Sequence, residues 1–186
     1  MINNIQQKTI AAGGAVGSVL KPATWKEKGI RWSIGMATFL LCLLMLILSI
    51  YWSRSPDMFD VSENALQQIA SDEGEKAVPG STTTAALITV ATTLLDKPGG
   101  FLSNDVMPPS VLLDNMPNWE FGVLVQVRDL ARALRNEMSR SQSQSLEDKD
   151  LMVAEPQFSI SNESWMFPSA EGSYRKGIKA LQSYLD

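Results

Sequence analysis

Residues 34–52 read IGMATFLLCLLMLILSIYW, and this stretch contains no charged side chain. At about 1.5 Å of rise per residue, a helix of this length spans roughly the 30 Å of a bilayer's hydrocarbon core. A helix also satisfies its own backbone hydrogen bonds, which lipid cannot do. Core helices of soluble proteins rarely run this long without a charge. The stretch therefore predicts one transmembrane helix.

The residues that flank this span predict its orientation. Basic side chains dominate the sequence before it, whereas acidic side chains dominate after it: Lys21, Lys26, Lys28 and Arg31 precede it with Glu27, and Arg54 follows it with Asp57, Asp60 and Glu63. Positive charge resists translocation, so we expect a cytoplasmic N-terminus. A cleaved signal peptide would have a shorter apolar region that ends in small residues, but this span ends in Tyr51 and Trp52. We therefore expect an uncleaved signal anchor.

The charge distribution supports this division. Residues 1–33 carry five basic side chains and one acidic side chain, a net charge of +4, and residues 53–186 carry eleven and nineteen, a net charge of −8; the sum is −4. We expect a basic cytoplasmic tail, largely disordered, over residues 1–33, because glycine and polar residues leave little apolar surface there. Membrane lipid is an expected partner, and the basic residues would be attracted to anionic lipids. The alternative, which we favour, is that these charges only set the topology. Nucleic acid is not an expected partner, because the larger segment is acidic and has no aromatic-basic motif.

Cysteine and histidine usage excludes several chemistries. The chain has one cysteine, Cys42, which lies inside the apolar span, and it has no histidine. An intramolecular disulfide, a Cys/His metal site and histidine-dependent catalysis are therefore not available. The sequence predicts no metal site, no cofactor and no catalytic residue.

The first half of the remaining chain predicts a linker, two helices and an irregular connection. Residues 53–59 form the linker. Asp60 followed by Glu63 is the spacing of a helix N-cap, so a helix should begin there and run to about Asp72. Residues 81–96 have apolar residues at helical spacing, and their length favours a helix over a strand. Residues 101–119 contain Pro108, Pro109 and Pro117 and predict a packed, irregular connection.

The clearest helix outside the membrane span is predicted over residues 119–139, with Asn118 as its N-cap. Its apolar residues recur at steps of four, three, four and four, and they form a seam of Val123, Val127, Leu130, Leu134 and Met138. Such a seam faces a protein core in most cases, but it also suits one side of a coiled-coil-like partner contact. The sequence leaves the two alternatives open.

The C-terminal part predicts two more helices. Ser145 with Asp148 should cap a short helix that ends at Pro156. Residues 158–168 predict an extended surface segment or a recognition patch. Ser169 should cap a final amphipathic helix with an apolar stripe of Tyr174, Ile178, Leu181 and Leu185. The expected fold class is mainly α, with a helical domain over residues 60–186.

Three stretches carry a resemblance to a known family: NWEFGVLVQVRDLARALRN at 118–136, SRSQSQS at 139–145 and YRKGIKAL at 174–181. From the membrane helix to the C-terminus, the chain resembles an uncharacterised family of Gram-negative inner-membrane proteins, domain of unknown function 2333. The resemblance implies a bacterial envelope protein, and it supplies no activity. Together with the orientation predicted from the flanking charges, it leads us to expect a periplasmic location for the domain that follows the span. Family members continue through further helices, so we expect a C-terminally truncated member with an incomplete domain.

Two classes of function remain. The first is a structural or interaction protein of the cell envelope, with Trp165, Met166 and Phe167 as candidate partner-binding residues, because aromatic side chains in a polar rim are typical of interaction hot spots. The alternative is a carboxylate-dependent envelope glycan hydrolase, because suitably spaced carboxylates serve glycan hydrolysis. Its candidate acids are Asp105, Asp114, Glu120 and Asp129. Without histidine or a recognisable nucleophile motif, the sequence favours binding over catalysis, and it indicates neither the partner nor the oligomeric state.

Overall fold

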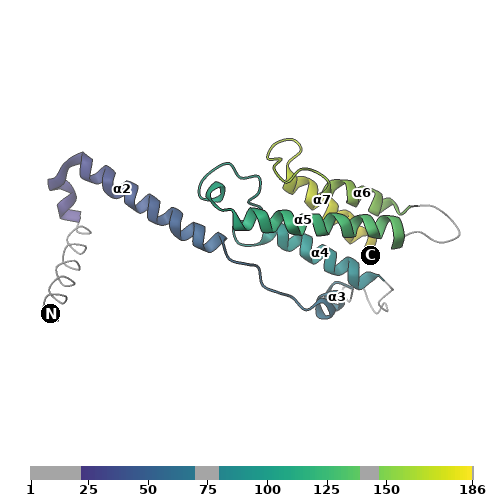
Figure 1. Cartoon of the computed structure of the whole chain (residues 1–186). Coiled ribbons are helices and arrows are strands. Elements are labelled where there is room, and N and C mark those ends of the chain that lie inside the picture. Colours follow the sequence, from purple (N-terminus) through teal and green to yellow (C-terminus); the bar gives the residue numbers. More distant parts are fainter. Residues whose placement is uncertain (1–21, 70–79, 139–146, 186) are drawn as a thin grey trace, which may run out of the picture. The chain divides into compact units, whose positions relative to one another are not determined.

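A computed structural model describes residues 22–69, 80–138 and 147–185, with the side chains of residues 22–28 and 138 excepted. Within these residues the chain is mainly helical and contains no strand (Figure 1), so the predicted fold class is confirmed. The chain divides into two compact units, Met1–Ile47 and Leu48–Asp186, and each is described by itself.

The helix α2, Pro22–Trp52, contains the apolar span. Its portion Gly29–Trp52 is 24 residues long, and the most apolar 18-residue window of this portion has a mean hydropathy of 2.5 and is only 6% buried. Low burial distinguishes this helix from the core helix of a soluble protein, whereas a membrane anchor and a signal sequence both fit. The hydroxyl of Thr38 donates a hydrogen bond to the carbonyl of Ile34 at 3.0 Å, so this polar side chain is satisfied inside the apolar span.

Helix α2 begins earlier than the sequence analysis placed the membrane span. Residues 22–33, assigned there to a largely disordered tail, are helical, and the rest of that tail lies outside the described residues. Pro22 occupies the first helical position, where its fixed φ suits a helix and its missing N–H is not needed. Gly29 interrupts the helix with a φ of 73°, a conformation that glycine adopts without strain.

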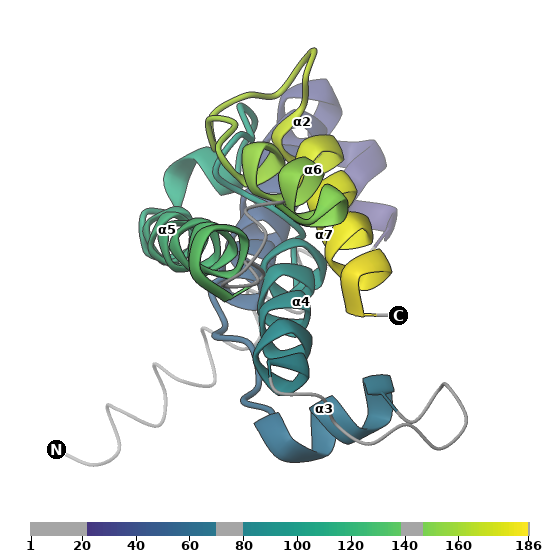
Figure 2. The same cartoon turned by 90° about the vertical axis from the view of Figure 1, so that its right-hand side faces the viewer.

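Four helices of the second unit form a bundle: α4 (Ser81–Asp96), α5 (Asn115–Ala133), α6 (Lys149–Phe158) and α7 (Ala170–Leu185). Each packs on the next in sequence, and α7 packs back on α4, so the ring of contacts is closed (Figure 2). The helix α3, Val61–Ile69, packs on α4 from outside the bundle. The helix predicted over residues 81–96 is confirmed, and the predicted end of the preceding helix at Asp72 lies outside the described residues.

Three aromatic side chains of the bundle core pack on one another: Phe101, Phe158 and Tyr174. The ring of Tyr174 packs edge-on against Phe101, at 5.6 Å between centroids and 86° between planes, and it stacks on Phe158 at 6.3 Å. The phenol donates a hydrogen bond to the carbonyl of Ile160 at 2.8 Å. A Cβ at Gly177 would meet the Phe158 ring at 2.8 Å, so glycine there allows α6 and α7 to approach closely. These contacts tie the end of α6 to the middle of α7.

Two of the predicted helix starts are confirmed by side-chain caps. The carboxylate of Asp60 accepts a hydrogen bond from the amide of Glu63 at 2.9 Å, which caps α3. The hydroxyl of Ser169 accepts one from the amide of Gly172 at 3.1 Å, which caps α7. In both cases a side-chain oxygen satisfies an amide that the first turn of a helix leaves without a partner.

The short helix α6 differs from its prediction. Asp148 is its N-cap, because its carboxylate accepts from the amides of Asp150 and Leu151, and Ser145 lies outside the described residues. The predicted end at Pro156 is wrong, since the helix continues to Phe158. Phe158 is completely buried in the bundle core, so tertiary packing outweighs the proline's missing hydrogen bond.

Helix α5 starts and ends differently from the prediction as well. It begins at Asn115, not at Trp119, and Pro117 lies in its first turn, where a proline costs no hydrogen bond. After Ala133 the chain continues as a π-helical turn, η2 (Leu134–Met138). A one-turn 3-10 helix, η1 (Ser110–Leu112), precedes α5, so the predicted irregular connection covers residues 97–114.

The predicted seam of α5 is rotated relative to the buried face. The buried face consists of Met116, Glu120, Leu124, Val127, Ala131 and Leu134. Val127 and Leu134 belong to both sets, whereas Val123 and Leu130 are only partly buried against the core. The seam from Val123 to Leu134 is therefore core, not a partner-binding surface, and the side chain of Met138 lies outside the described residues. The carboxylate of Glu120 lies on the buried face.

Candidate functional site

Two connections between bundle helices, residues 97–114 and 159–169, meet at one end of the bundle (Figure 1). The side chain of Asn104 joins them, because its carboxamide nitrogen donates to the carbonyl of Ser164 at 3.1 Å and to Glu171 Oε2 at 3.0 Å. This end of the bundle holds the three predicted partner-binding residues and one predicted acid, so it is the candidate site.

A buried ion pair anchors the first connection. Lys97 and Glu120 have fully buried side chains, and the lysine ammonium donates to Glu120 Oε1 and to the carbonyl of Gly100. Glu120 also accepts from the amide of Leu102 at 2.8 Å and from the amide of Ser103 at 2.7 Å. A buried carboxylate is tolerated only when it is paired and hydrogen-bonded in this way. Glu120 therefore holds residues 100–103 in place beneath the site.

The second connection presents apolar side chains from a fixed backbone. The hydroxyl of Ser164 donates to the carbonyl of Pro168 at 2.6 Å, and the Ser164 carbonyl accepts from the amide of Ala170 at 2.8 Å. Between these contacts, Trp165, Met166 and Phe167 are 60%, 55% and 98% exposed. Hydrogen bonds thus close the segment at its base while its three large apolar side chains face solvent.

The first connection contributes further exposed apolar side chains to the same end of the bundle: Val106, Met107, Val111 and Leu112. Large apolar residues gathered on neighbouring loops differ from the scattered single ones of an ordinary surface. We call the set of Val106, Met107, Val111, Leu112, Trp165, Met166 and Phe167 the apolar end.

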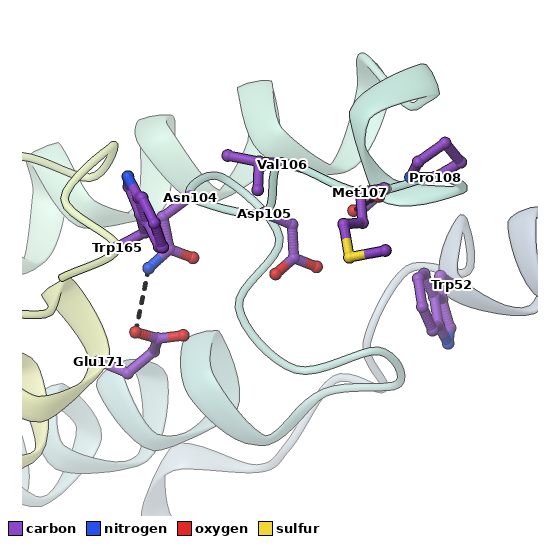
Figure 3. Close-up of a pocket in the computed structure, with 9 residues that line it drawn as sticks. Trp52, Asn104, Asp105, Val106, Met107, Pro108, Trp165 and Glu171 are labelled. Carbon is purple, nitrogen blue, oxygen red and sulfur yellow. Dashed lines mark hydrogen bonds between the residues drawn. The ribbon is translucent and has the colours of Figure 1, made fainter.

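A pocket of about 320 Å³ opens beside the apolar end (Figure 3). Its lining combines two tryptophan rings, apolar side chains and two carboxylates: Trp52, Asn104, Asp105, Val106, Met107, Pro108, Ser110, Trp165 and Glu171. Figure 3 shows Asp105 and Glu171 with their carboxylates turned toward the space between the two tryptophans. Asn104 and Glu171 were not singled out from the sequence, because only the fold brings residues this far apart into one pocket.

The four acids proposed for hydrolysis do not converge. Glu120 is completely buried in its ion pair, and Asp114 and Asp129 are exposed without lining this pocket. Of these four acids, only Asp105 lines the pocket. Among the described residues, no group of three or more acidic or cysteine side chains is placed to hold a metal ion.

Fold and site together define a mainly helical protein in which a helix long and apolar enough to cross a membrane precedes a four-helix bundle with an apolar end. The chain belongs to the family described as "Uncharacterized protein conserved in bacteria (DUF2333)", which it matches over residues 25–186. No curated protein and no solved structure matches the chain. The family resemblance of the sequence is therefore confirmed, and the family description assigns no activity.

Proposed function

We propose that this protein is a single-pass protein of the bacterial inner membrane, with a cytoplasmic N-terminus, and that its helical bundle lies in the periplasm and binds another envelope protein. The observation that carries the proposal is the exposure of Trp165, Met166 and Phe167 on a hydrogen-bonded loop. The contact would use these three side chains.

The energetics of exposed aromatic residues support a binding role. Leaving a large apolar side chain in water forgoes about 1.5–3 kcal/mol relative to burying it. The loop 161–168 does not fold these side chains back onto the core, although the core lies close enough to bury Ile160 partly. A partner that covers Trp165 and Phe167 recovers this free energy, and the fixed loop has little conformational entropy left to lose.

The alternative, a carboxylate-dependent glycan hydrolase, has weaker support. Glu120 serves a structural ion pair, and only Asp105 of the four proposed acids lines the pocket. Incubating the purified chain with isolated cell-wall glycan tests this alternative. If the parent chain releases new reducing ends and the Asp105→Asn variant does not, the hydrolase would be favoured over the binding role.

The topology is tested with reporter fusions after Asp186. The positive flank before the span predicts that alkaline phosphatase is active there and that a fluorescent protein that matures only in the cytoplasm is dark. Carbonate washing should leave the chain in the membrane pellet. A bright cytoplasmic reporter or release by carbonate would contradict the proposed location.

The contact itself is tested by photo-crosslinking in intact cells. A crosslinking amino acid at position 167 should capture one discrete envelope protein, and the same amino acid at position 121 should not, because Phe121 is an exposed aromatic residue of α5 that belongs neither to the loop 161–168 nor to the apolar end. The double variant Trp165→Ser with Phe167→Ser should abolish copurification of that protein without loss of folding. Equal capture from both positions would contradict a specific contact.

A further inference from the structure

The carboxamide of Asn104 contains a buried acceptor without a partner. Asn104 is 7% exposed. Its carboxamide nitrogen donates one hydrogen bond to the carbonyl of Ser164 and one to Glu171 Oε2, so both of its hydrogens are used. Both of these partners are acceptors, so the orientation of the amide is fixed, because a flip would set oxygen against oxygen. The remaining atom, Asn104 Oδ1, is buried and has no hydrogen-bond donor within the described part of the chain. Buried acceptors are rarely left unpaired, so this one calls for a donor from outside.

The surroundings of this oxygen define the donor. Figure 3 shows Asn104 Oδ1 on the side that faces Asp105, and Asn104 is one of the residues that line the pocket of about 320 Å³. Two carboxylates and two tryptophan rings line the pocket, and none of its lining residues in the described chain is a lysine or arginine. Carboxylates attract a cation, tryptophan faces bind cations, and an unpaired oxygen requires an N–H or O–H. A primary ammonium group meets all three conditions.

We propose that this pocket binds the primary ammonium group of an ethanolamine phospholipid headgroup. The choice of a lipid rests on the membrane-anchored placement proposed above. Trp52 is the last residue of the apolar span and also lines the pocket, and tryptophans at the end of a span lie at headgroup level. Exposed Val106 and Met107 flank the same pocket and suit the apolar boundary of a membrane.

The same geometry predicts selectivity among headgroups. An ethanolamine ammonium has three N–H donors, one for Asn104 Oδ1 and the others for Asp105 and Glu171. A choline headgroup interacts with the tryptophan faces but donates no hydrogen bond, so Asn104 Oδ1 stays unpaired. A phosphoglycerol headgroup is anionic and is repelled by the two carboxylates. The expected order of affinity is ethanolamine, then choline, then glycerol.

Native mass spectrometry of the full chain in detergent tests this order with short-chain phosphatidylethanolamine, phosphatidylcholine and phosphatidylglycerol as probes. We expect the ethanolamine lipid to bind at least about tenfold more tightly than the other two, the fold-change of one lost charge-assisted hydrogen bond. The double variant Asp105→Asn with Glu171→Gln should reduce ethanolamine lipid binding by about the same factor. Asp114→Asn is the matched control, because Asp114 is exposed and does not line the pocket.

Three results would overturn the inference. The first is equal affinity for the ethanolamine and choline lipids, and the second is unchanged ethanolamine lipid binding by the double variant when circular dichroism shows it folded. The third is equally tight binding of free lysine amide, which would assign the pocket to a soluble amine and not to lipid. These measurements are made in detergent, and their variants change Asp105 and Glu171 but none of Trp165, Met166 and Phe167. Their failure is therefore distinguishable from a failure of the proposed topology or partner contact.

Discussion

Replacing Glu120 by glutamine should destabilise the bundle by about 3–5 kcal/mol, the usual cost of breaking a buried ion pair from one side. The structure supplies the reasons. Glu120 is completely buried and accepts from Lys97, from the amides of Leu102 and Ser103, and from the Ser103 hydroxyl at 2.5 Å. Glutamine has one acceptor oxygen in place of two, and its NH2 group would face a backbone N–H that now donates to Glu120. That backbone N–H loses its acceptor, which costs about 1–3 kcal/mol of stability. The Lys97 ammonium also loses its counter-charge.

Urea unfolding of the full chain in mild detergent measures this loss. Near-UV circular dichroism is the suitable signal, because it reports the packing of aromatic side chains such as Tyr174, whereas the far-UV signal includes the helix α2, which detergent keeps helical. The matched control is Arg175→Gln, since the ion pair of Arg175 with Asp96 is formed at 2.7 Å but has both side chains about half exposed. Exposed pairs contribute about 0–1 kcal/mol, so this variant should differ little from the parent.

A double variant separates the buried charge from the lost hydrogen bonds. Lys97→Met combined with Glu120→Gln removes the uncompensated ammonium, so it should recover part of the stability that Glu120→Gln alone loses. A loss of less than about 1 kcal/mol in Glu120→Gln would refute the assignment of Glu120 as the buried anchor of the loop.

Three further variants test the rest of the bundle by the same unfolding measurement. Leu134→Ala should cost about 2–5 kcal/mol because Leu134 is buried, and Leu130→Ala should cost clearly less because Leu130 is only partly buried; equal costs would contradict the corrected helix face. Asp148→Ala should cost about 1 kcal/mol through the lost cap of α6, and no loss would show that the cap is dispensable. Burial raises the pKa of Tyr174 to about 12, above the ordinary value of 10.0. The unfolded tyrosine then loses its proton before the folded one, so stability should fall by up to about 2 kcal/mol as the pH rises from 10 to 12. Tyr174→Phe should flatten this decline relative to the parent at the same pH values, and an unchanged slope would contradict it.

The parts of the fold that follow from local chemistry were predictable. The uncharged stretch after residue 33, the cap at Asp60 and the cap at Ser169 each involve residues within a few positions of one another, and all three appear in the structure. A side-chain oxygen three residues before an amide is a strong signal, since the first turn of a helix always leaves such amides unpaired. The helix over residues 81–96 was predictable from spacing and length.

The misplaced face of α5 has a physical explanation. The sequence pattern favoured Val123, Leu130 and their apolar neighbours, and a glutamate was not counted as a core residue. Glu120 enters the core because Lys97, 23 positions earlier, is buried opposite it. Glu120 lies four residues after Met116 and four before Leu124, and this spacing places it on the same face of the helix as these two buried residues. The spacing alone does not predict burial of a carboxylate, because only the partner lysine makes that burial favourable.

The residues of the pocket lay beyond sequence reasoning for a similar reason. Asn104 and Glu171 are 67 positions apart and meet only because two interhelical connections close the same end of the bundle. Nothing local distinguishes either residue from a solvated surface side chain. By contrast, the exposed cluster at Trp165 was visible as a dense aromatic group, although only the structure shows that the loop holds it outward.

The burial of Glu120 also decides how loss-of-function variants at this end of the bundle should be interpreted. Glu120 holds the backbone of Leu102 and Ser103, which leads directly into Asn104 and the pocket. A Glu120 variant would therefore disturb lipid binding, partner binding and hydrolysis alike, so its phenotype carries no information about catalysis. Asp105 lines the same pocket with an exposed side chain, and its amide variant leaves the buried ion pair intact. Any activity that depends on a carboxylate at this site must consequently be argued from Asp105 or Glu171, with Asp114→Asn as the control for charge alone.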